Sequence, residues 1–127
     1  MSRQPLVMVA DDDALLRSLV AFKLKARGYR VATAGDGDEA LRAIGEERPD
    51  LVVLDAMMPG ADGFEVLRQI KDDAKTAAIP VVMLSARKQE SDIVGALQLG
   101  ASDYMVKPFI PEELAMRVAR LLPGEPA

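Results

Sequence analysis

The sequence predicts an α/β fold in which helices cover both faces of a parallel sheet. Short apolar segments alternate five times with longer segments of helical periodicity within 127 residues. The apolar segments run without regular polar interruption, which is typical of strands that are buried on both faces. The connections between the segments are short, as expected when strands and helices alternate along the chain.

Five segments are the predicted strands. They span residues 6–10, 30–34, 51–54, 81–84 and 104–106. The run at 51–54 is Leu-Val-Val-Leu and contains no polar residue, so we expect both of its faces to be covered.

Local signals place the five predicted helices. The first runs from about 14 to 27 and stops before Gly28, a favoured residue after a helix. The second begins near Asp36, which with Glu39 resembles a capping box, and the third begins near Asp62. The fourth spans about 91–99, and the fifth begins at Pro111, because proline suits the first helical position. An apolar stripe, of the kind that packs a helix on a core, follows the first helix: Leu15, Leu16, Leu19, Val20 and Phe22.

Composition limits the functions that this chain can have. We expect residues 1–122 to form one domain and residues 123–127 to be a tail or linker remnant. The net charge of −4 argues against direct nucleic-acid binding, and no apolar stretch is long enough to span a bilayer, so we expect a cytoplasmic protein. The sequence has no cysteine and no histidine, so a bound metal would meet oxygen ligands, which favours Mg²⁺, Mn²⁺ or Ca²⁺.

Charged and polar residues follow the predicted strands. Asp11-Asp12-Asp13 follows the first strand, Asp55 the third, Ser85 the fourth and Lys107 the fifth. Ligands in open α/β sheets bind where the carboxyl ends of the strands meet, so we expect these side chains to converge there. Asp55 ends an apolar run, and burying its carboxylate is costly unless a cation meets it.

Each of these residues also has a purely structural interpretation. Asp11 and Asp12 can cap the following helix, a role that we expect for Asp13, and Asp55 can hold the turn at Pro59-Gly60. Lys107 can be a solvated surface residue, and Ser85 can serve a turn. Tyr104 can simply fill the core.

Taken in order, these residues resemble the response-regulator receiver domain of two-component signalling, which has the fold of the chemotaxis regulator CheY. The resemblance covers residues 6–122 and rests on five groups at the expected strand ends, with 30 residues from Asp55 to Ser85 and 52 from Asp55 to Lys107. The groups are Asp11-Asp12, Asp55 with Met58-Pro59-Gly60 and Asp62-Gly63, Ser85-Ala86, Tyr104, and Lys107-Pro108.

The resemblance implies a doubly wound, CheY-like fold with strand order 2-1-3-4-5, and it implies a role for each residue. Asp55 would be the phosphoacceptor. Asp12, Asp55 and the backbone carbonyl of Met57 would bind Mg²⁺ or Mn²⁺ directly, and Asp11 would act mainly through water. Lys107, after a cis bond to Pro108, and Ser85 would contact the phosphoryl group. Ser85 and Tyr104 would form a coupled switch.

The implied function is a phosphorylation-controlled signalling switch, not an enzyme acting on a separate substrate. A histidine kinase or phosphotransfer protein would donate the phosphoryl group to a domain that catalyses its own phosphorylation. The surface of the fourth helix, fifth strand and fifth helix would then bind a downstream protein or an attached output domain. A phosphorylation-dependent homodimer could use Asp103, Glu113 and Arg117 on that surface. The apolar Met57, two residues after Asp55, suggests slow self-dephosphorylation.

Three alternatives remain from the sequence. The chain could be the receiver of a longer regulator, such as a transcription factor or a diguanylate cyclase, cut within 123–127. A degenerate receiver used only for docking is a second alternative, although the residues needed for the chemistry are present. A phosphohydrolase of the haloacid dehalogenase type is the third, but such enzymes carry an aspartate where this chain has Met57.

Overall fold

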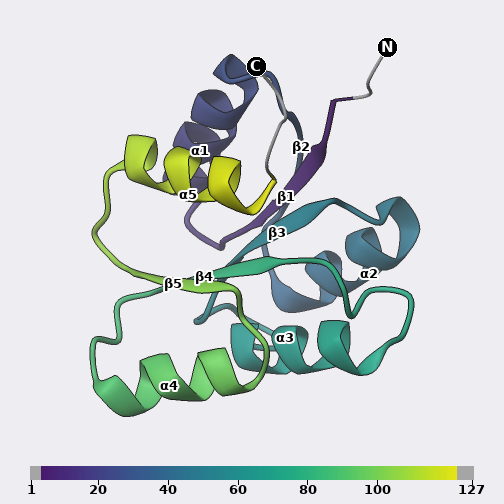
Figure 1. The fold of residues 1–127 in the computed structure, drawn as a ribbon, viewed down its shortest axis with the longest axis vertical. Helices are drawn as coiled ribbons and strands as arrows, with labels where there is room; N and C mark the ends of the chain where they lie inside the picture. The colour runs from purple at the N-terminus through teal and green to yellow at the C-terminus, as the bar shows by residue number, and fades with distance from the viewer. Residues whose placement is uncertain (1–3, 123–127) are drawn as a thin grey trace.

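A computed structural model describes residues 4–122, and it contains a five-stranded parallel sheet between two layers of helices (Figure 1). The strand order is β2-β1-β3-β4-β5, which confirms the predicted order 2-1-3-4-5. The strands are β1 (Leu6–Ala10), β2 (Arg30–Ala34), β3 (Leu51–Asp55), β4 (Val81–Ser85) and β5 (Asp103–Val106). The helices are α1 (Ala14–Ala26), α2 (Gly37–Glu47), α3 (Gly63–Asp72), α4 (Glu90–Gln98) and α5 (Pro111–Leu121).

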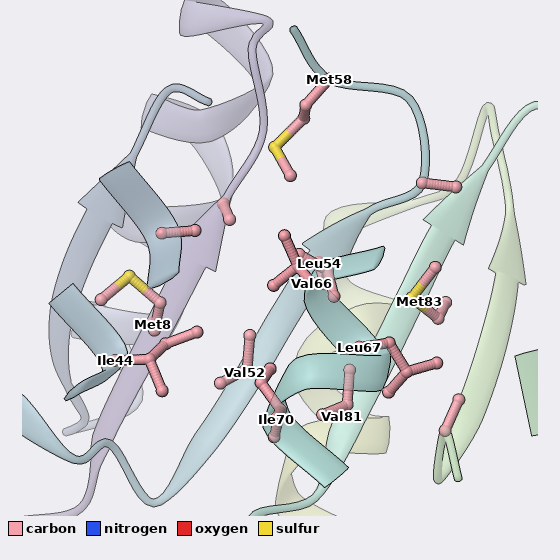
Figure 2. Packing of buried hydrophobic residues seen from close by; sticks show 14 of the residues in the cluster. Met8, Ile44, Val52, Leu54, Met58, Val66, Leu67, Ile70, Val81 and Met83 are labelled. Atoms are coloured by element: carbon pink, nitrogen blue, oxygen red, sulfur yellow. The ribbon is translucent and has the colours of Figure 1, made fainter. Parts of the chain in front are cut away.

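Helices pack on the two faces of the sheet in unequal numbers. α1 and α5 cover one face, and α2, α3 and α4 cover the other (Figure 1). Strand residues alternate between the two resulting cores, so that Val53 belongs to the α1–α5 side while Val52 and Leu54 belong to the opposite side (Figure 2). All five residues of β1, β3 and β4 are buried, including the polar Asp55 and Ser85 at the ends of β3 and β4.

The residues predicted to begin and end the helices do so in the structure. Asp36 accepts a hydrogen bond from the Glu39 N–H at 2.8 Å, and Asp62 accepts one from the Glu65 N–H at 2.9 Å. α5 begins at Pro111, and Gly28 follows α1 with a φ of 98°. The predicted tail at 123–127 lies outside the described residues, so the domain boundary remains a prediction.

The apolar stripe expected for α1 is only partly its buried face: Val20 is buried and Leu16 packs against the same core, but the other three residues are exposed. Leu15 is 71% exposed, Leu19 49% and Phe22 72%, whereas Val20, Ala21 and Leu24 are buried. Leu15, Leu19 and Phe22 are spaced by four and three residues, so they share one side of the helix, and Val20 and Leu24 lie on the other. α1 therefore carries two apolar faces, and the sheet covers only one of them.

Candidate functional site

Four strand ends bring the predicted site residues to one edge of the sheet. Asp55 is the last residue of β3 and Ser85 the last of β4, each one residue beyond the predicted strand end. Asp11 and Lys107 directly follow β1 and β5. The register aligns Ala10 with Leu54 and Ser85 with Val106, so the next residues along neighbouring strands also lie side by side.

Three carboxylates gather at this edge. One carboxylate oxygen from each of Asp11, Asp12 and Asp55 lies within 4.8 Å of the other two. Asp11 is 1% exposed and Asp55 3%, while Asp12 faces solvent. Like charges at this separation repel, and a cation relieves that repulsion. The cluster confirms that Asp11, Asp12 and Asp55 converge as the sequence predicts.

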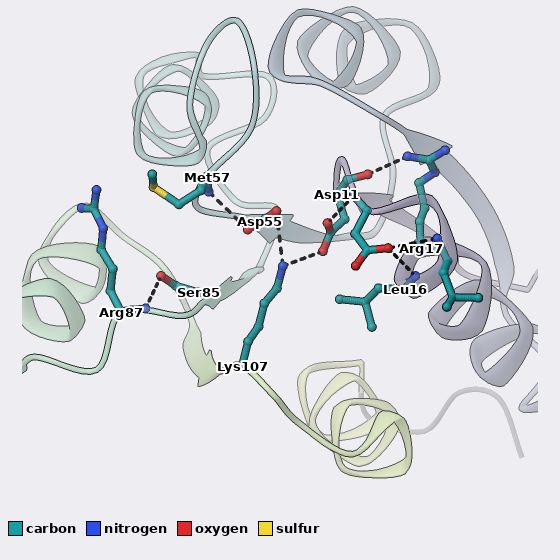
Figure 3. A network of polar contacts seen from close by, with 10 residues as sticks. Asp11, Leu16, Arg17, Asp55, Met57, Ser85, Arg87 and Lys107 are labelled. Carbon is teal, nitrogen blue, oxygen red and sulfur yellow. Dashed lines mark hydrogen bonds and ion pairs between the residues drawn. The ribbon is translucent and has the colours of Figure 1, made fainter.

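Lys107 supplies one positive charge to the cluster. Its Nζ lies 3.1 Å from Oδ2 of Asp11 and 3.3 Å from Oδ2 of Asp55, so it bridges the two buried carboxylates (Figure 3). The peptide bond from Lys107 to Pro108 is cis, as expected from the resemblance. The surface-residue interpretation of Lys107 is therefore wrong.

Burial raises the pKa of Asp55 to about 7. The nearby Asp11 carboxylate also raises it, while the Met57 N–H and the Lys107 ammonium oppose the shift. Burial lowers the pKa of Lys107, but the hydrogen bond to Asp11 and the two carboxylate charges outweigh it and raise the pKa overall. The raised pKa means that the site disfavours the charged form of Asp55 unless a further cation is present.

Backbone groups fix the carboxylates. The Met57 N–H donates to Oδ1 of Asp55 at 3.2 Å, and the Asp13 N–H donates to Oδ1 of Asp11 at 2.9 Å. Asp13 caps α1 by accepting hydrogen bonds from two backbone N–H groups, so the capping interpretation holds for Asp13. The Arg17 guanidinium donates to the carbonyl oxygen of Asp11 at 2.7 Å, a contact that the sequence analysis missed. Its signal in the sequence is a basic residue on the first helix, four positions after Asp13.

Ser85 and Tyr104 meet at the backbone of a third residue. Oγ of Ser85 accepts a hydrogen bond from the Arg87 N–H at 3.0 Å, and the Tyr104 hydroxyl donates to the Arg87 carbonyl at 3.0 Å. Tyr104 is 9% exposed as a residue and belongs to the apolar core, so its side chain lies inward. The Arg87 side chain pairs with Asp92 at 3.7 Å and lies over the ring of Phe64. Ser85 and Tyr104 were predictable from the sequence, but their connection through the Arg87 backbone was not, since backbone donors and acceptors leave no sequence signal.

The face of α1 that the sheet leaves uncovered borders the site. A hollow of about 490 Å³ lies beside Lys107, and its apolar lining includes Leu15, Leu16, Leu19 and Phe109. Met57, two residues after Asp55, is 52% exposed. The described residues include no helix that is both long and apolar enough to cross a membrane.

Asp103, Glu113 and Arg117 lie together within one chain. Arg117 pairs with Asp103 at 2.8 Å and with Glu113 at 3.1 Å. A dimer that used these residues across its interface would therefore have to exchange existing ion pairs.

Comparison with known proteins gives concordant matches. The family model described as the response regulator receiver domain matches residues 7–119. The chain is 44% identical over 116 residues to the alkaline phosphatase synthesis transcriptional regulatory protein PhoP of Bacillus subtilis, covering 91% of this chain and 48% of that protein. It is 46% identical over 116 residues to the DNA-binding response regulator MtrA of Mycobacterium tuberculosis, covering 91% of this chain and 50% of that protein. The chain thus spans about half the length of the curated relatives it matches.

Solved structures agree with this family at the level of the fold. The receiver domain of the Francisella response regulator 1452 superposes with a TM-score of 0.87 at 36% identity, over 93% of this chain and 96% of that chain. The chemotaxis protein CheY4 of Vibrio cholerae superposes with a TM-score of 0.88 at 31% identity, over 94% of this chain and 99% of that chain. With the acidic cluster and its bridging lysine at the carboxyl edge of the sheet, these matches show that the chain belongs to the response regulator receiver domain family.

Proposed function

We propose that this receiver domain accepts a phosphoryl group on Asp55 from a histidine kinase or phosphotransfer protein, in a reaction that depends on Mg²⁺. The observation that carries the proposal is the convergence of three carboxylates and Lys107 at one sheet edge. Asp55 is the carboxylate that both ends a buried strand and contacts Lys107, so it combines a fixed position with a cation next to its oxygens.

The donor set fits Mg²⁺, or Mn²⁺ in its place. All three side chains offer carboxylate oxygens, the ligand type that hard divalent cations prefer. Asp12, Asp55 and the backbone carbonyl of Met57 would bind the ion directly, and Asp11 would act mainly through water. When bound, the ion would neutralise charge on Asp55 and on the incoming phosphoryl group and hold the two in line.

The chain's own residues would then promote the transfer. An oxygen of Asp55 attacks phosphorus, and an O–P bond forms as the P–N bond to the donor histidine breaks. The bond electrons leave with the imidazole, which the donor protein retains. The Lys107 ammonium exchanges its ion pair with Asp55 for one with a phosphoryl oxygen. The Ser85 hydroxyl donates a hydrogen bond to a second phosphoryl oxygen. The domain in this way assists its own phosphorylation.

The phosphodonor would dock on the uncovered face of α1. The exposed side chains of Leu15 and Leu19 continue into the hollow beside Lys107, so a donor on this surface is also next to Asp55. An apolar face of this kind is suited to a helix from another protein.

Phosphorylation would act on the surface of α4, β5 and α5 through the Ser85–Arg87–Tyr104 connection. When Oγ of Ser85 moves toward the phosphoryl group and away from the Arg87 N–H, that hydrogen bond is lost and the loop that carries the Tyr104 acceptor is released to move. A downstream protein, an attached output domain or a second copy would read this change. The DNA-binding activity named for MtrA favours an attached output domain, with 1–122 as the receiver and 123–127 as the linker, in a cytoplasmic regulator.

Intact-mass spectrometry tests the proposed function. The protein is incubated with acetyl phosphate and Mg²⁺, beside Asp55→Asn, and with EDTA in a parallel sample. We expect one added phosphoryl group on the native protein and none on Asp55→Asn or in EDTA. Asp62→Asn changes the exposed capping residue of α3 and should still be modified. A native protein that neither binds Mg²⁺ nor gains mass would support a docking module instead.

A further inference from the structure

The first turn of α2 lies against the loop that follows Asp55. This loop, residues 56–62, joins β3 to α3 and carries Met57. The Gly37 N–H, at the start of α2, donates to the Pro59 carbonyl at 3.3 Å. α2 is therefore bonded directly to the loop that is proposed to supply a metal ligand.

The approach of α2 to this loop is too close for any side chain at Gly37. A Cβ built on Gly37 would lie 1.7 Å from the carbonyl oxygen of Ala61 and 2.6 Å from its carbonyl carbon. Real Cβ atoms essentially never approach within 3.0 Å, and the obstructing atoms are backbone. A larger residue at 37 would have to push the loop and the helix apart by more than an ångström.

The rest of the loop has little freedom to absorb such a shift. Met58 is 7% exposed and packs in the same apolar cluster as Ala40 of α2 (Figure 2). At the far end, the Gly63 N–H donates to the Ala56 carbonyl at 3.0 Å, and a Cβ on Gly63 would meet the Asp55 carbonyl at 2.2 Å. The loop is thus held at Met58 and Pro59 on one side of Ala61 and at Gly63 on the other, so a displacement imposed at Ala61 strains the short segment that also carries Met57.

We propose that Gly37 is a positioning residue for the metal and phosphoacceptor site, acting through the 56–62 loop. Without a side chain at Gly37, α2 packs directly on the loop. This contact fixes where the Met57 backbone lies relative to Asp55. Mg²⁺ requires near-octahedral geometry at short distances, so a small shift of a carbonyl ligand weakens binding. This inference rests on the proposed function, because it assigns Gly37 a role toward the proposed metal site.

A second glycine in α2 provides a matched control. A Cβ on Gly45 would meet nothing within 4 Å, so Gly45→Ala adds a methyl group to the same helix without contact. We expect Gly37→Ala to reduce Mg²⁺ affinity by about tenfold and Gly45→Ala to leave it unchanged. Affinity is measured on the folded proteins by titration of Mg²⁺ alone, followed by ¹H–¹⁵N NMR, with circular dichroism as the check on folding.

The titration separates a positioning role from a loss of stability. Gly45→Ala should stabilise α2, so Gly37→Ala is also made in that background to keep it folded. If both Gly37 variants fail to fold, Asp36→Ala is titrated with Mg²⁺ instead. This substitution removes the side chain that caps the Glu39 N–H, so it loosens the first turn of α2 without adding a Cβ at position 37. We then expect a smaller loss of affinity, of about two- to threefold.

Each outcome is informative. A folded Gly37→Ala protein that binds Mg²⁺ as tightly as the native protein overturns the inference, as does unchanged affinity in Asp36→Ala when it is the only variant that folds. A native protein that binds no Mg²⁺ overturns the proposed metal site itself, and with it the role of Gly37. Weaker Mg²⁺ binding in Gly37→Ala, with unchanged binding in Gly45→Ala, supports the positioning role of Gly37.

Discussion

Replacing Asp55 with asparagine should stabilise the metal-free protein, and by more at pH 8 than at pH 5. Burial raises the pKa of Asp55 from 3.8 to about 7. Between these two values the folded protein holds a proton that the unfolded chain has released, so raising the pH favours unfolding. Above about pH 7 the Asp55 carboxylate is ionised in both the folded and the unfolded protein, so the loss of folding stability no longer increases with pH.

The size of the effect follows from the same shift. One pKa unit corresponds to about 1.4 kcal/mol, so the free energy of unfolding of the native protein should fall by roughly 2–3 kcal/mol from pH 5 to pH 8. Asp55→Asn has no charge to bury and should lack this loss. Lys107 keeps Asp11 as a partner at 3.1 Å in the variant, so the substitution leaves no unpaired ammonium group.

Urea unfolding followed by circular dichroism in EDTA, at pH 5, 6, 7 and 8, measures this difference. The sequence contains no histidine, so few other groups change charge within this range. Adding Mg²⁺ at pH 8 should stabilise the native protein more than Asp55→Asn, because the ion binds the folded state and offsets the buried charge. A stability difference that is the same at pH 5 and pH 8 would refute the reasoning from burial.

Three further substitutions test other parts of the site. Lys107→Gln removes the charge that bridges Asp11 and Asp55, so phosphorylation by acetyl phosphate should slow by roughly 100-fold in a mass-spectrometric time course; an unchanged rate would contradict its role. Tyr104→Phe deletes the hydrogen bond to the Arg87 carbonyl and should cost about 1 kcal/mol in urea unfolding, whereas equal stability would mean that the bond adds nothing over water. Met57→Asn places a polar group beside the acceptor and should speed loss of the phosphoryl group by about tenfold; an equally long-lived phosphoprotein would argue against the predicted slow self-dephosphorylation.

Uninterrupted apolar runs and helix signals were enough to predict most of the fold. Each strand boundary lies within one residue of its prediction, because a run of apolar residues is a local property of the chain. The site edge was also predictable from local signals. In a parallel sheet every strand presents its carboxyl end at the same edge, so residues that end or follow strands must meet there.

The resemblance to receiver domains added what periodicity could not. The strand order depends on which crossover each helix makes, and nothing in a single segment specifies it. The family pattern supplied the order, and the sheet confirms it. The roles of Ser85, Tyr104 and the Met57 carbonyl likewise came from the family, and they stay predictions.

By itself, the sequence determined which residues form strands and helices and which charged side chains stand at the site. Only the tertiary structure decided that Lys107 bridges both buried carboxylates, that Tyr104 lies inward on the Arg87 carbonyl, and that Leu15, Leu19 and Phe22 remain uncovered. It also decided that the backbone at Gly37 touches the loop after Asp55. Apolar patterns and caps act over a few neighbouring residues, whereas these contacts join segments distant in the chain, and their geometry exists only once the elements have packed.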